Sequence, residues 1–298
     1  MKNFTRYRST KLPFKQLRYT FVLFLACTLL PFAVSAQSSD SVKAQELAWE
    51  VETIAGGIEW KSYLGDDLFD ARLSINVIKI DLDAAGASMK IAFERDDLVK
   101  TSEFAEKYGA LAAINGSFFN PRAGGAVVFL RVDGTIISEG AGERNPYTEN
   151  GGIGWGEDGM ITILAKPDDG WQNVVLGNLM SSGPLLIYNG KQRNFRNDPF
   201  HENRHPRTAV AITQDNNLLL ITVDGRSFQS YGMTIPELAE FLESMGAVDA
   251  LNLDGGGSTA MWIKDKKTDG IVNYPSDNFE FDHEGERRVS NALLLLNN

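Results

Sequence analysis

The chain has 298 residues, of which 43% are hydrophobic and 23% are charged, and its formal net charge is −10. This is the composition of an ordinary globular protein, and it excludes a low-complexity chain. The acidic balance disfavours non-specific binding to nucleic acid or to an anionic membrane. The length suits one large domain or two small ones.

The first 36 residues have the features of a secretory signal peptide. Six basic and no acidic residues precede a short apolar stretch, and the small residues of Val34-Ser35-Ala36 follow it. We therefore expect cleavage after Ala36, which would leave a secreted or periplasmic protein of residues 37–298 with a formal charge of −16 and no membrane insertion. Cys27 is the single cysteine, so the mature chain would contain no disulfide.

Strand patterns dominate the rest of the chain, and no Pro/Ser-rich linker interrupts it. The clearest helix is expected after Thr234, which forms a capping box with Glu237, and Gly246 is expected to follow its end. We predict an α+β fold: a single domain with a mixed, largely antiparallel sheet flanked by a few helices. Apolar and β-branched runs bounded by turn residues predict strands at residues 74–83, 88–94, 126–137, 160–165, 184–191, 208–213, 217–225 and 291–296.

Two stretches of the sequence follow one pattern, GALAAIN at 109–115 and GAVDALN at 246–252. Each follows a helical stretch and leads into a polar loop that contains glycine and serine. We interpret this as an internal helix–strand–loop repeat and expect both loops to leave the same edge of the sheet. Asn115 and Asn252 would then face one cleft, because ligands commonly bind at strand ends.

A glycine-rich loop is the main candidate for a site. Residues 251–262 read LNLDGGGSTAMW, so Asp254 ends an apolar strand and three glycines follow it. Such a loop permits close approach to a ligand, but Asp-Gly also forms tight turns, and both interpretations stay open. Further charged or polar residues stand at the ends of other apolar runs. We expect one cleft to hold Asn115, Arg207, Asp224, Arg226 and Asp254.

Several familiar motifs are excluded. Residues 201–205 read HENRH, but the zinc motif that these letters match needs both histidines on one helix face, and Pro206 disfavours helical geometry at His205. The glycine loop lacks the lysine of a phosphate-binding P-loop and the second glycine of a serine-hydrolase elbow. We therefore expect no metal ligands and no required cofactor. Calcium binding by Asp224 and Asp254 stays an open alternative.

Seven segments, taken in order, resemble the phosphodiester glycosidase family. They are INGSFF (114–119), SGPLLIYNGK (182–191), HPRTAVAI (205–212), VDGRS (223–227), MTIPELAEFLESMGAVDALNLDGGGSTAMW (233–262), NYPSD (273–277) and ERRVSNALLL (286–295). The resemblance covers about residues 50–298. Arg288 departs from the family pattern, which leads us to expect proline after Arg287. The resemblance implies a glycosidase that cleaves a sugar-1-phosphodiester, such as that of N-acetylglucosamine, into sugar and phosphomonoester.

The resemblance also implies a site with positive charge for the phosphate and a carboxylate near the anomeric carbon. It assigns catalysis to Asp254, Asp224 and Arg207. It assigns substrate binding to Asn115, Ser117, Gly183, Arg226, Asn252, Gly255, Gly256, Ser258, Thr259, Arg287 and Asn291. The expected partner is a sugar phosphodiester or a glycan. Two alternatives remain open: a non-catalytic protein that binds carbohydrate or the cell envelope, and a calcium-stabilised surface protein.

Overall fold

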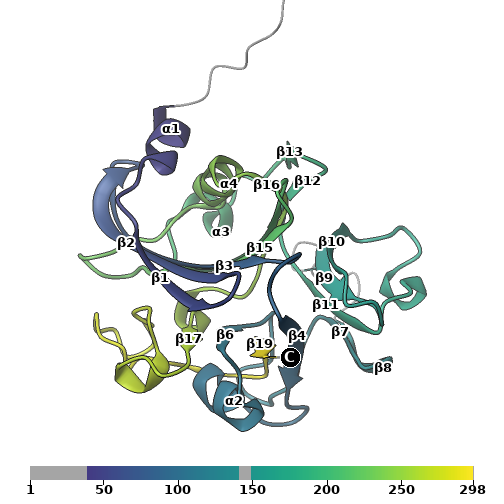
Figure 1. Ribbon diagram of the computed structural model, residues 1–298. Coiled ribbons are helices and arrows are strands. Elements are labelled where there is room, and N and C mark those ends of the chain that lie inside the picture. The colour runs from purple at the N-terminus through teal and green to yellow at the C-terminus, as the bar shows by residue number, and fades with distance from the viewer. Residues whose placement is uncertain (1–38, 141–148, 298) are drawn as a thin grey trace, which may run out of the picture. The chain divides into compact units, whose positions relative to one another are not determined.

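The computed structural model describes residues 39–140 and 149–297 (Figure 1), and the expected signal peptide lies outside them. The described residues belong to one compact unit. Its strands pair antiparallel and its helices are few, which confirms the α+β prediction. The strands form four sheets rather than one, however. Among the described residues, no helix has the length and apolar character needed to cross a membrane.

The largest sheet has eight strands and runs through the middle of the fold (Figure 1). Its strands, in spatial order, are β1 (Glu50–Ala55), β2 (Ile58–Leu68), β3 (Ala71–Asp81), β15 (Asn217–Val223), β14 (Arg207–Thr213), β16 (Ala247–Asn252), β12 (Leu185–Tyr188) and β13 (Lys191–Gln192).

Three smaller sheets complete the strand structure. The five-stranded sheet contains β10 (Ile161–Ala165), β9 (Gly151–Trp155), β11 (Asn178–Ser182), β7 (Phe129–Val132) and β8 (Thr135–Glu139). The four-stranded sheet contains β17 (Met261–Ile263), β6 (Ala112–Asn115), β19 (Asn291–Asn297) and β4 (Ala87–Phe93). A two-stranded sheet pairs β18 (Arg288–Val289) with β5 (Val99–Lys100).

The helices are short. They are α1 (Ser39–Gln45), α2 (Thr101–Tyr108), α3 (Pro199–Glu202) and α4 (Ile235–Ser244), with 3-10 turns η2 (Trp171–Asn173), η3 (Gly256–Ser258) and η4 (Thr268–Gly270). The capping box predicted for α4 is present, because Thr234 Oγ1 accepts from the Glu237 amide while the Glu237 carboxylate accepts from the Thr234 amide.

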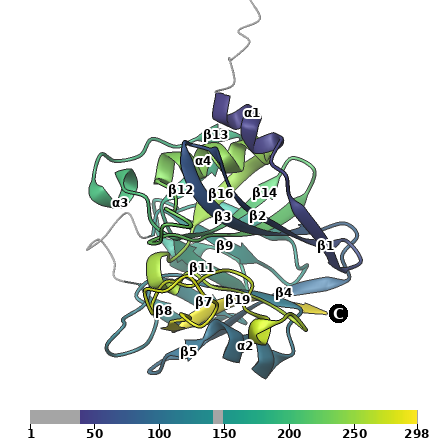
Figure 2. The same ribbon diagram turned by 90° about the vertical axis from the view of Figure 1, so that its left-hand side faces the viewer.

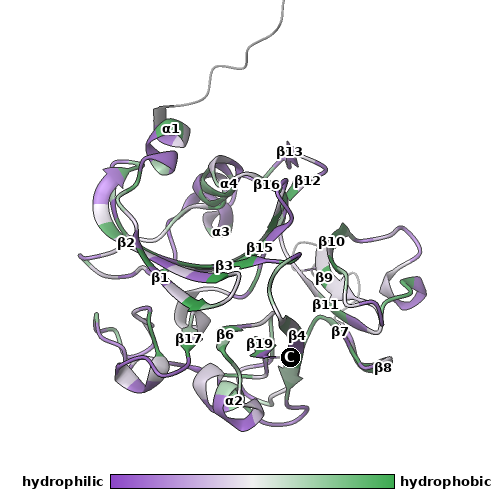
Figure 3. Ribbon diagram, viewed as in Figure 1, coloured by the Kyte–Doolittle hydropathy of each residue, from purple (hydrophilic) through white to green (hydrophobic). Residues whose placement is uncertain are grey.

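The core consists of two apolar layers on opposite faces of the large sheet. Alternation along β3 explains both layers, since successive side chains of a strand point to opposite faces. Leu73 and Ile75 pack with α4, whereas Ile78 and Ile80 pack against the smaller sheets. The helix α2 covers the far side of the four-stranded sheet. Figure 2 shows α4 and α2 at opposite ends of this stack, and Figure 3 shows hydrophobic residues along its strands.

Several strand boundaries differ from the sequence expectation. The run 126–137 is a hairpin of β7 and β8, with the turn at Asp133-Gly134. Seven strands, β1, β2, β5, β9, β11, β17 and β18, were not expected. Of these, β9 has three glycines among its five residues and β2 is largely polar, so neither presents a β-branched or apolar run.

The internal repeat is present as helix, strand and loop in both copies. The helix α2 precedes β6 and α4 precedes β16, with Gly109 and Gly246 at positive φ between helix and strand. The expectation that both loops leave one sheet is wrong, because β6 lies in the four-stranded sheet and β16 in the eight-stranded sheet. The two strands nevertheless bring their loops together.

Candidate functional site

The loops that follow β6 and β16 are joined by hydrogen bonds. Asn115 donates through Nδ2 to the carbonyl oxygen of Asp254 at 2.7 Å, and the Asp254 amide donates to the Gly116 carbonyl at 3.1 Å. Asn115 Oδ1 accepts from Thr208 Oγ1 at 2.7 Å and from the Ala260 amide at 3.1 Å. The Asn115 side chain is fully buried and its bonds are made within the protein. Asn115 therefore holds the glycine loop in place.

The glycine loop also rests on the segment that leads into β14. The Gly256 amide donates to the carbonyl oxygen of Pro206 at 2.9 Å. A Cβ on Gly255 would lie 2.6 Å from that same oxygen. A Cβ on Gly225 would lie 2.8 Å from the Pro206 nitrogen, so glycines approach Pro206 from two loops. Close backbone packing thus explains Gly255.

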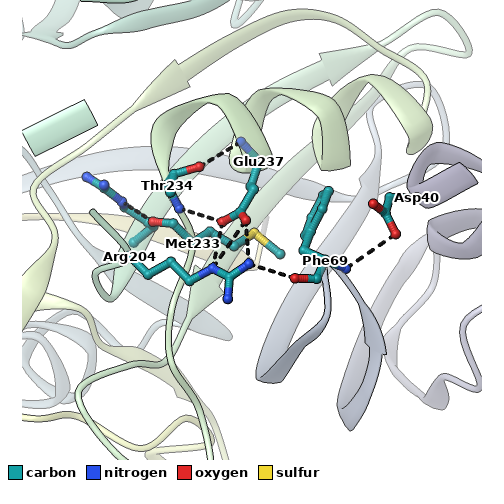
Figure 4. Close-up of polar contacts among 7 residues, drawn as sticks. Asp40, Phe69, Arg204, Met233, Thr234 and Glu237 are labelled. Carbon is teal, nitrogen blue, oxygen red and sulfur yellow. Dashed lines mark hydrogen bonds and ion pairs between the residues drawn. The ribbon is translucent and has the colours of Figure 1, made fainter. Parts of the chain in front are cut away.

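An ion pair positions the segment before Pro206 (Figure 4). Arg204 donates through Nη2 to Glu237 Oε1 at 2.6 Å and through Nε to Glu237 Oε2 at 3.1 Å. The same Nη2 donates to the Phe69 carbonyl at 2.6 Å. Because Glu237 belongs to the capping box of α4, this ion pair fastens the Pro206 segment to the start of that helix.

Two arginines lie against consecutive glycines of the loop. Nη2 of Arg226 is 2.8 Å from the position of a Cβ on Gly256, and Nη2 of Arg287 is 2.5 Å from that of a Cβ on Gly257. Arg287 donates through Nε and Nη2 to Asp277 Oδ1, the Nε bond being 2.9 Å long. Because Gly256 and Gly257 have no side chains, the two guanidinium groups can lie against the loop backbone. Guanidinium groups present bidentate donors that are suited to phosphate.

Asp254 carries a carboxyl group that is surrounded by protein yet remains partly accessible to solvent. Burial raises its pKa from the ordinary value of 3.8 to about 6, while the Ser258 hydroxyl, the Arg287 charge and the Gly255 amide act in the opposite direction. A carboxyl with a raised pKa beside cationic groups is a candidate for acid–base or nucleophilic work. Of the predicted residues, Asp254, Arg226 and Arg287 are brought together around the glycines.

Asp224, the second predicted carboxylate, is fully buried. Its Oδ2 accepts from Ser74 Oγ at 2.6 Å, and its Oδ1 accepts from Asn273 Nδ2 at 2.8 Å and from the Tyr274 amide at 3.0 Å. Burial raises the pKa of Asp224, and these hydrogen bonds lower it. Asn273 also donates to the Thr259 carbonyl. Asp224 thus anchors the segment that leads to Asp277, and both its oxygens already face donors, which does not suit calcium binding.

The Arg207 side chain points away from the glycine loop. It donates to the carbonyl oxygens of Met233 at 2.8 Å, Phe200 at 2.8 Å and Asn203 at 3.1 Å, and burial lowers its pKa to about 10. Thr208, the next residue of β14, points to the opposite face and reaches Asn115. The structure therefore does not bring Arg207 to the other candidates, and its catalytic role remains a prediction without geometric support.

The other predicted binding residues line the loops around the site. The Ser117 amide donates to Asn291 Oδ1 at 2.7 Å, and Asn252 Nδ2 donates to the Gly183 carbonyl at 2.9 Å. Among the described residues, no partner reaches Ser117 Oγ, Asn252 Oδ1 or Thr259 Oγ1, although all three atoms are buried. A buried polar atom without a partner costs about 1–3 kcal/mol, and these three atoms are closed to solvent.

The two histidines of HENRH belong to different elements. His201 lies in α3, which ends at Glu202, and its Nδ1 contacts Asp198 Oδ1 at 2.8 Å. His205 forms an isolated bridge with Met233, and burial lowers its pKa, with Arg207 and Arg226 acting in the same direction. Within residues 39–140 and 149–297, no three histidine, cysteine or acidic side chains gather as metal ligands.

Asp277 was not among the residues chosen from the sequence, although the quoted segment NYPSD contains it. Its ion pair with Arg287 crosses ten positions of an irregular segment, and no periodicity connects them. The available signal was the similarity of the two segments NYPSD and ERRVSNALLL to one family.

Comparisons with known proteins find relatives of this chain. The sequence model of the phosphodiester glycosidase family matches residues 108–296. The chain is 29% identical over 185 residues to mouse (Mus musculus) N-acetylglucosamine-1-phosphodiester alpha-N-acetylglucosaminidase, a match that covers 57% of this chain and 34% of that protein. It is 28% identical over 182 residues to the SPbeta prophage-derived uncharacterized protein YomE of Bacillus subtilis (strain 168), covering 59% and 27%. The matches span about a quarter to a third of these relatives.

A solved structure shares the fold. The zebrafish N-acetylglucosamine-1-phosphodiester alpha-N-acetylglucosaminidase catalytic domain, auto-inhibited by its pro-peptide, superposes with a TM-score of 0.63 at 20% identity, covering 84% of this chain and 88% of that chain. A hypothetical protein from Synechocystis superposes with a TM-score of 0.59 at 16% identity, covering 80% and 62%.

Proposed function

Because the chain belongs to the phosphodiester glycosidase family, we propose that it is a secreted or periplasmic hydrolase of sugar-1-phosphodiesters. The substrate class is that of N-acetylglucosamine-1-phosphodiesters, the class named for the mouse relative. Water adds across the bond between the anomeric carbon and the phosphate oxygen. The products are a free sugar, which takes the water oxygen, and a phosphomonoester, which keeps the former bridging oxygen.

The observation that carries this proposal is the placing of two guanidinium groups against consecutive glycines beside a partly accessible carboxyl. Arg226 and Arg287 would hold the phosphate by charge-assisted hydrogen bonds. Asp254 would act at the anomeric carbon, where an oxocarbenium-like charge develops. The phosphomonoester is a good leaving group, so the reaction needs less help from a general acid than cleavage of an ordinary glycoside.

The polar residues around the loop favour a sugar at this end of the site. Ser117 Oγ, Thr259 Oγ1 and Asn252 Oδ1 lack partners among the described residues, and they flank the loop that carries Asp254. Sugar hydroxyls and an acetamido group both donate and accept hydrogen bonds, so they match such a mixed set.

Oxygen-18 labelling tests the reaction. The purified protein is incubated in H₂¹⁸O with the methyl phosphodiester of N-acetylglucosamine, as separate α and β anomers, and the products are identified by NMR and mass spectrometry. We expect ¹⁸O in the released sugar and none in methyl phosphate. Label in the phosphate, or release of sugar-1-phosphate, would instead show cleavage at phosphorus and contradict the proposal. Saturable binding without any release would favour the carbohydrate-binding alternative.

The N-terminal residue of the expressed protein tests the proposed secretion. Expression of the full sequence in a bacterial host with a general secretion pathway should yield a protein that begins at Gln37. A cytoplasmic protein that retains Met1 would contradict the proposed location without bearing on the hydrolytic activity.

A further inference from the structure

A cavity of about 860 Å³ lies under the edge strands of the large sheet. Its roof is formed by β1, β2 and β3, and its floor by the segment that follows β17, the yellow-green region at the lower left of Figure 1. None of Arg226, Asp254 and Arg287 lines it. Its volume falls within the range of roughly 300–1,000 Å³ that is usual for small-molecule sites.

The face of β2 and β3 that lines the cavity changes from apolar to polar along the strands. Ile58 and Ile80 pair across these strands and pack in the core. Further along the same face, Ser62 stands directly opposite Asn76, and both line the cavity. Because alternate residues of a strand share one face, this face would extend the apolar core if folding alone shaped it. The polar pair instead marks a surface suited to a hydrophilic ligand.

Asn76 is the buried polar residue of this surface, with an exposed fraction of only 2%. Its Oδ1 accepts from the indole nitrogen of Trp60 at 3.1 Å. Its Nδ2 has no hydrogen-bond partner among the described residues and is not sealed from solvent, so the amide opens into the cavity that it lines. Buried amides are nearly always satisfied, and since no described residue accepts from this one, a ligand in the cavity can supply the acceptor.

Charges around the cavity favour a neutral ligand. The wall carries acids such as Glu50 and bases such as Lys267, and the Lys266 ammonium is paired with the Glu52 carboxylate. Neither sign prevails, unlike the pair of arginines at the glycine loop. Hydroxyl groups of a ligand can donate to the carboxylates and accept from Asn76 and Lys267, while Trp60 offers an apolar edge.

We propose that this cavity is a second binding site, separate from the glycine loop, and that it takes a neutral oligosaccharide. The site is independent of the proposed hydrolysis, because its residues do not include the groups assigned to the phosphodiester. An enzyme with such a site would hold a glycan at one place while its glycine loop acts elsewhere.

Titration with neutral trisaccharides tests the proposal. Tri-N-acetylchitotriose, maltotriose and mannotriose are added to the purified full-length protein, and binding is followed by calorimetry and by tryptophan emission, for which Trp60 lies in the cavity wall. We expect saturable binding of at least one sugar with a Kd of about 1 mM or tighter. Ser62→Phe, which fills the cavity, should weaken it about tenfold or more, and so should Asn76→Ser.

Two matched variants separate the sites. Lys61→Phe adds the same ring on the same strand but on the other face, and it should leave binding unchanged. Asp254→Asn should also leave trisaccharide binding unchanged. Absence of saturable binding up to about 10 mM for all three sugars would overturn the proposal. Binding that survives Ser62→Phe in a folded protein, or that is lost on Asp254→Asn, would overturn it as well.

Discussion

The side-chain amide of Asn115 donates a 2.7 Å hydrogen bond to the backbone carbonyl of Asp254, 139 positions later in the chain. This bond joins the ends of the two copies of the helix–strand–loop repeat, which belong to different sheets. The hydrogen bond from Asn115 thereby fixes the Asp254 backbone, while the Asp254 carboxyl remains partly accessible. The repeat thus contributes one copy that carries the candidate carboxylate and one copy that supports it.

Asn115→Ala should destabilise the protein and weaken turnover together. The change leaves Thr208 Oγ1 and the Ala260 amide without their buried acceptor, at about 1–3 kcal/mol for each group. For a domain of this size, each kcal/mol corresponds to roughly 2–4 °C in melting temperature. Differential scanning calorimetry measures the shift. A melting temperature that stays within about 1 °C of the parent would show that Asn115 does not support the loop.

Asp254→Asn should separate catalysis from folding. The variant keeps the shape of the side chain but removes the charge, so turnover should fall about 10²-fold or more. Its folded pKa lies above the ordinary value, so the stability that Asp254 contributes is present below about pH 4 and is lost as pH rises through about 6. The melting temperature at pH 7 should therefore be unchanged or raised. Unchanged turnover would remove Asp254 from the mechanism.

The pH dependence of kcat/KM should show an acid limb with an apparent pKa of about 6, since Asp254 must be ionised to act at a developing cation. Arg287 lowers the Asp254 pKa by its charge, so Arg287→Gln should move this limb to higher pH as well as raise KM. Initial rates between pH 4 and pH 9 measure both effects. A limb that stays in place on Arg287→Gln would mean that another group titrates.

Gly256→Ala should impair binding of the phosphodiester more than it impairs folding. A Cβ at Gly256 would displace the Arg226 guanidinium, and its φ of +61° adds a backbone cost of about 1–2 kcal/mol. Gly246→Ala is the matched control, because Gly246 has a φ of +84° and no atom within 4 Å of its Cβ position. We expect similar losses of melting temperature but a raised KM only for Gly256→Ala. If Gly246→Ala raised KM as much as Gly256→Ala does, the rise in KM would come from backbone strain and not from displacement of Arg226.

Asp224→Asn should cost much less turnover than Asp254→Asn, within about tenfold of the parent. The amide oxygen can still accept from Asn273 and Tyr274, and Ser74 Oγ can reverse its bond to accept from the new amide nitrogen. Asp224→Ala removes all three bonds and should destabilise the protein by several kcal/mol. A loss of 10²-fold or more in a stable Asp224→Asn protein would restore Asp224 as a catalytic carboxylate.

The sequence by itself determined the class of fold, the capping box of α4 and the repeat with its two asparagines. These features follow from local chemistry: side-chain alternation, backbone conformations open to glycine and asparagine, and hydrogen bonds across three or four positions. The run of three glycines had already marked the glycine loop as a candidate site. The family resemblance added Arg287, which the structure places against that loop.

Only the tertiary structure decided which charges meet. Arg207 and Thr208 are neighbours in the chain, but alternation along β14 sends the arginine toward backbone carbonyls near α3 and α4 and the threonine toward Asn115. Asp277 reaches Arg287 through an irregular segment that Asp224 anchors from another sheet. Pairing of strands far apart in the sequence sets these positions, and no local pattern of residues encodes which edge of which sheet a loop will share.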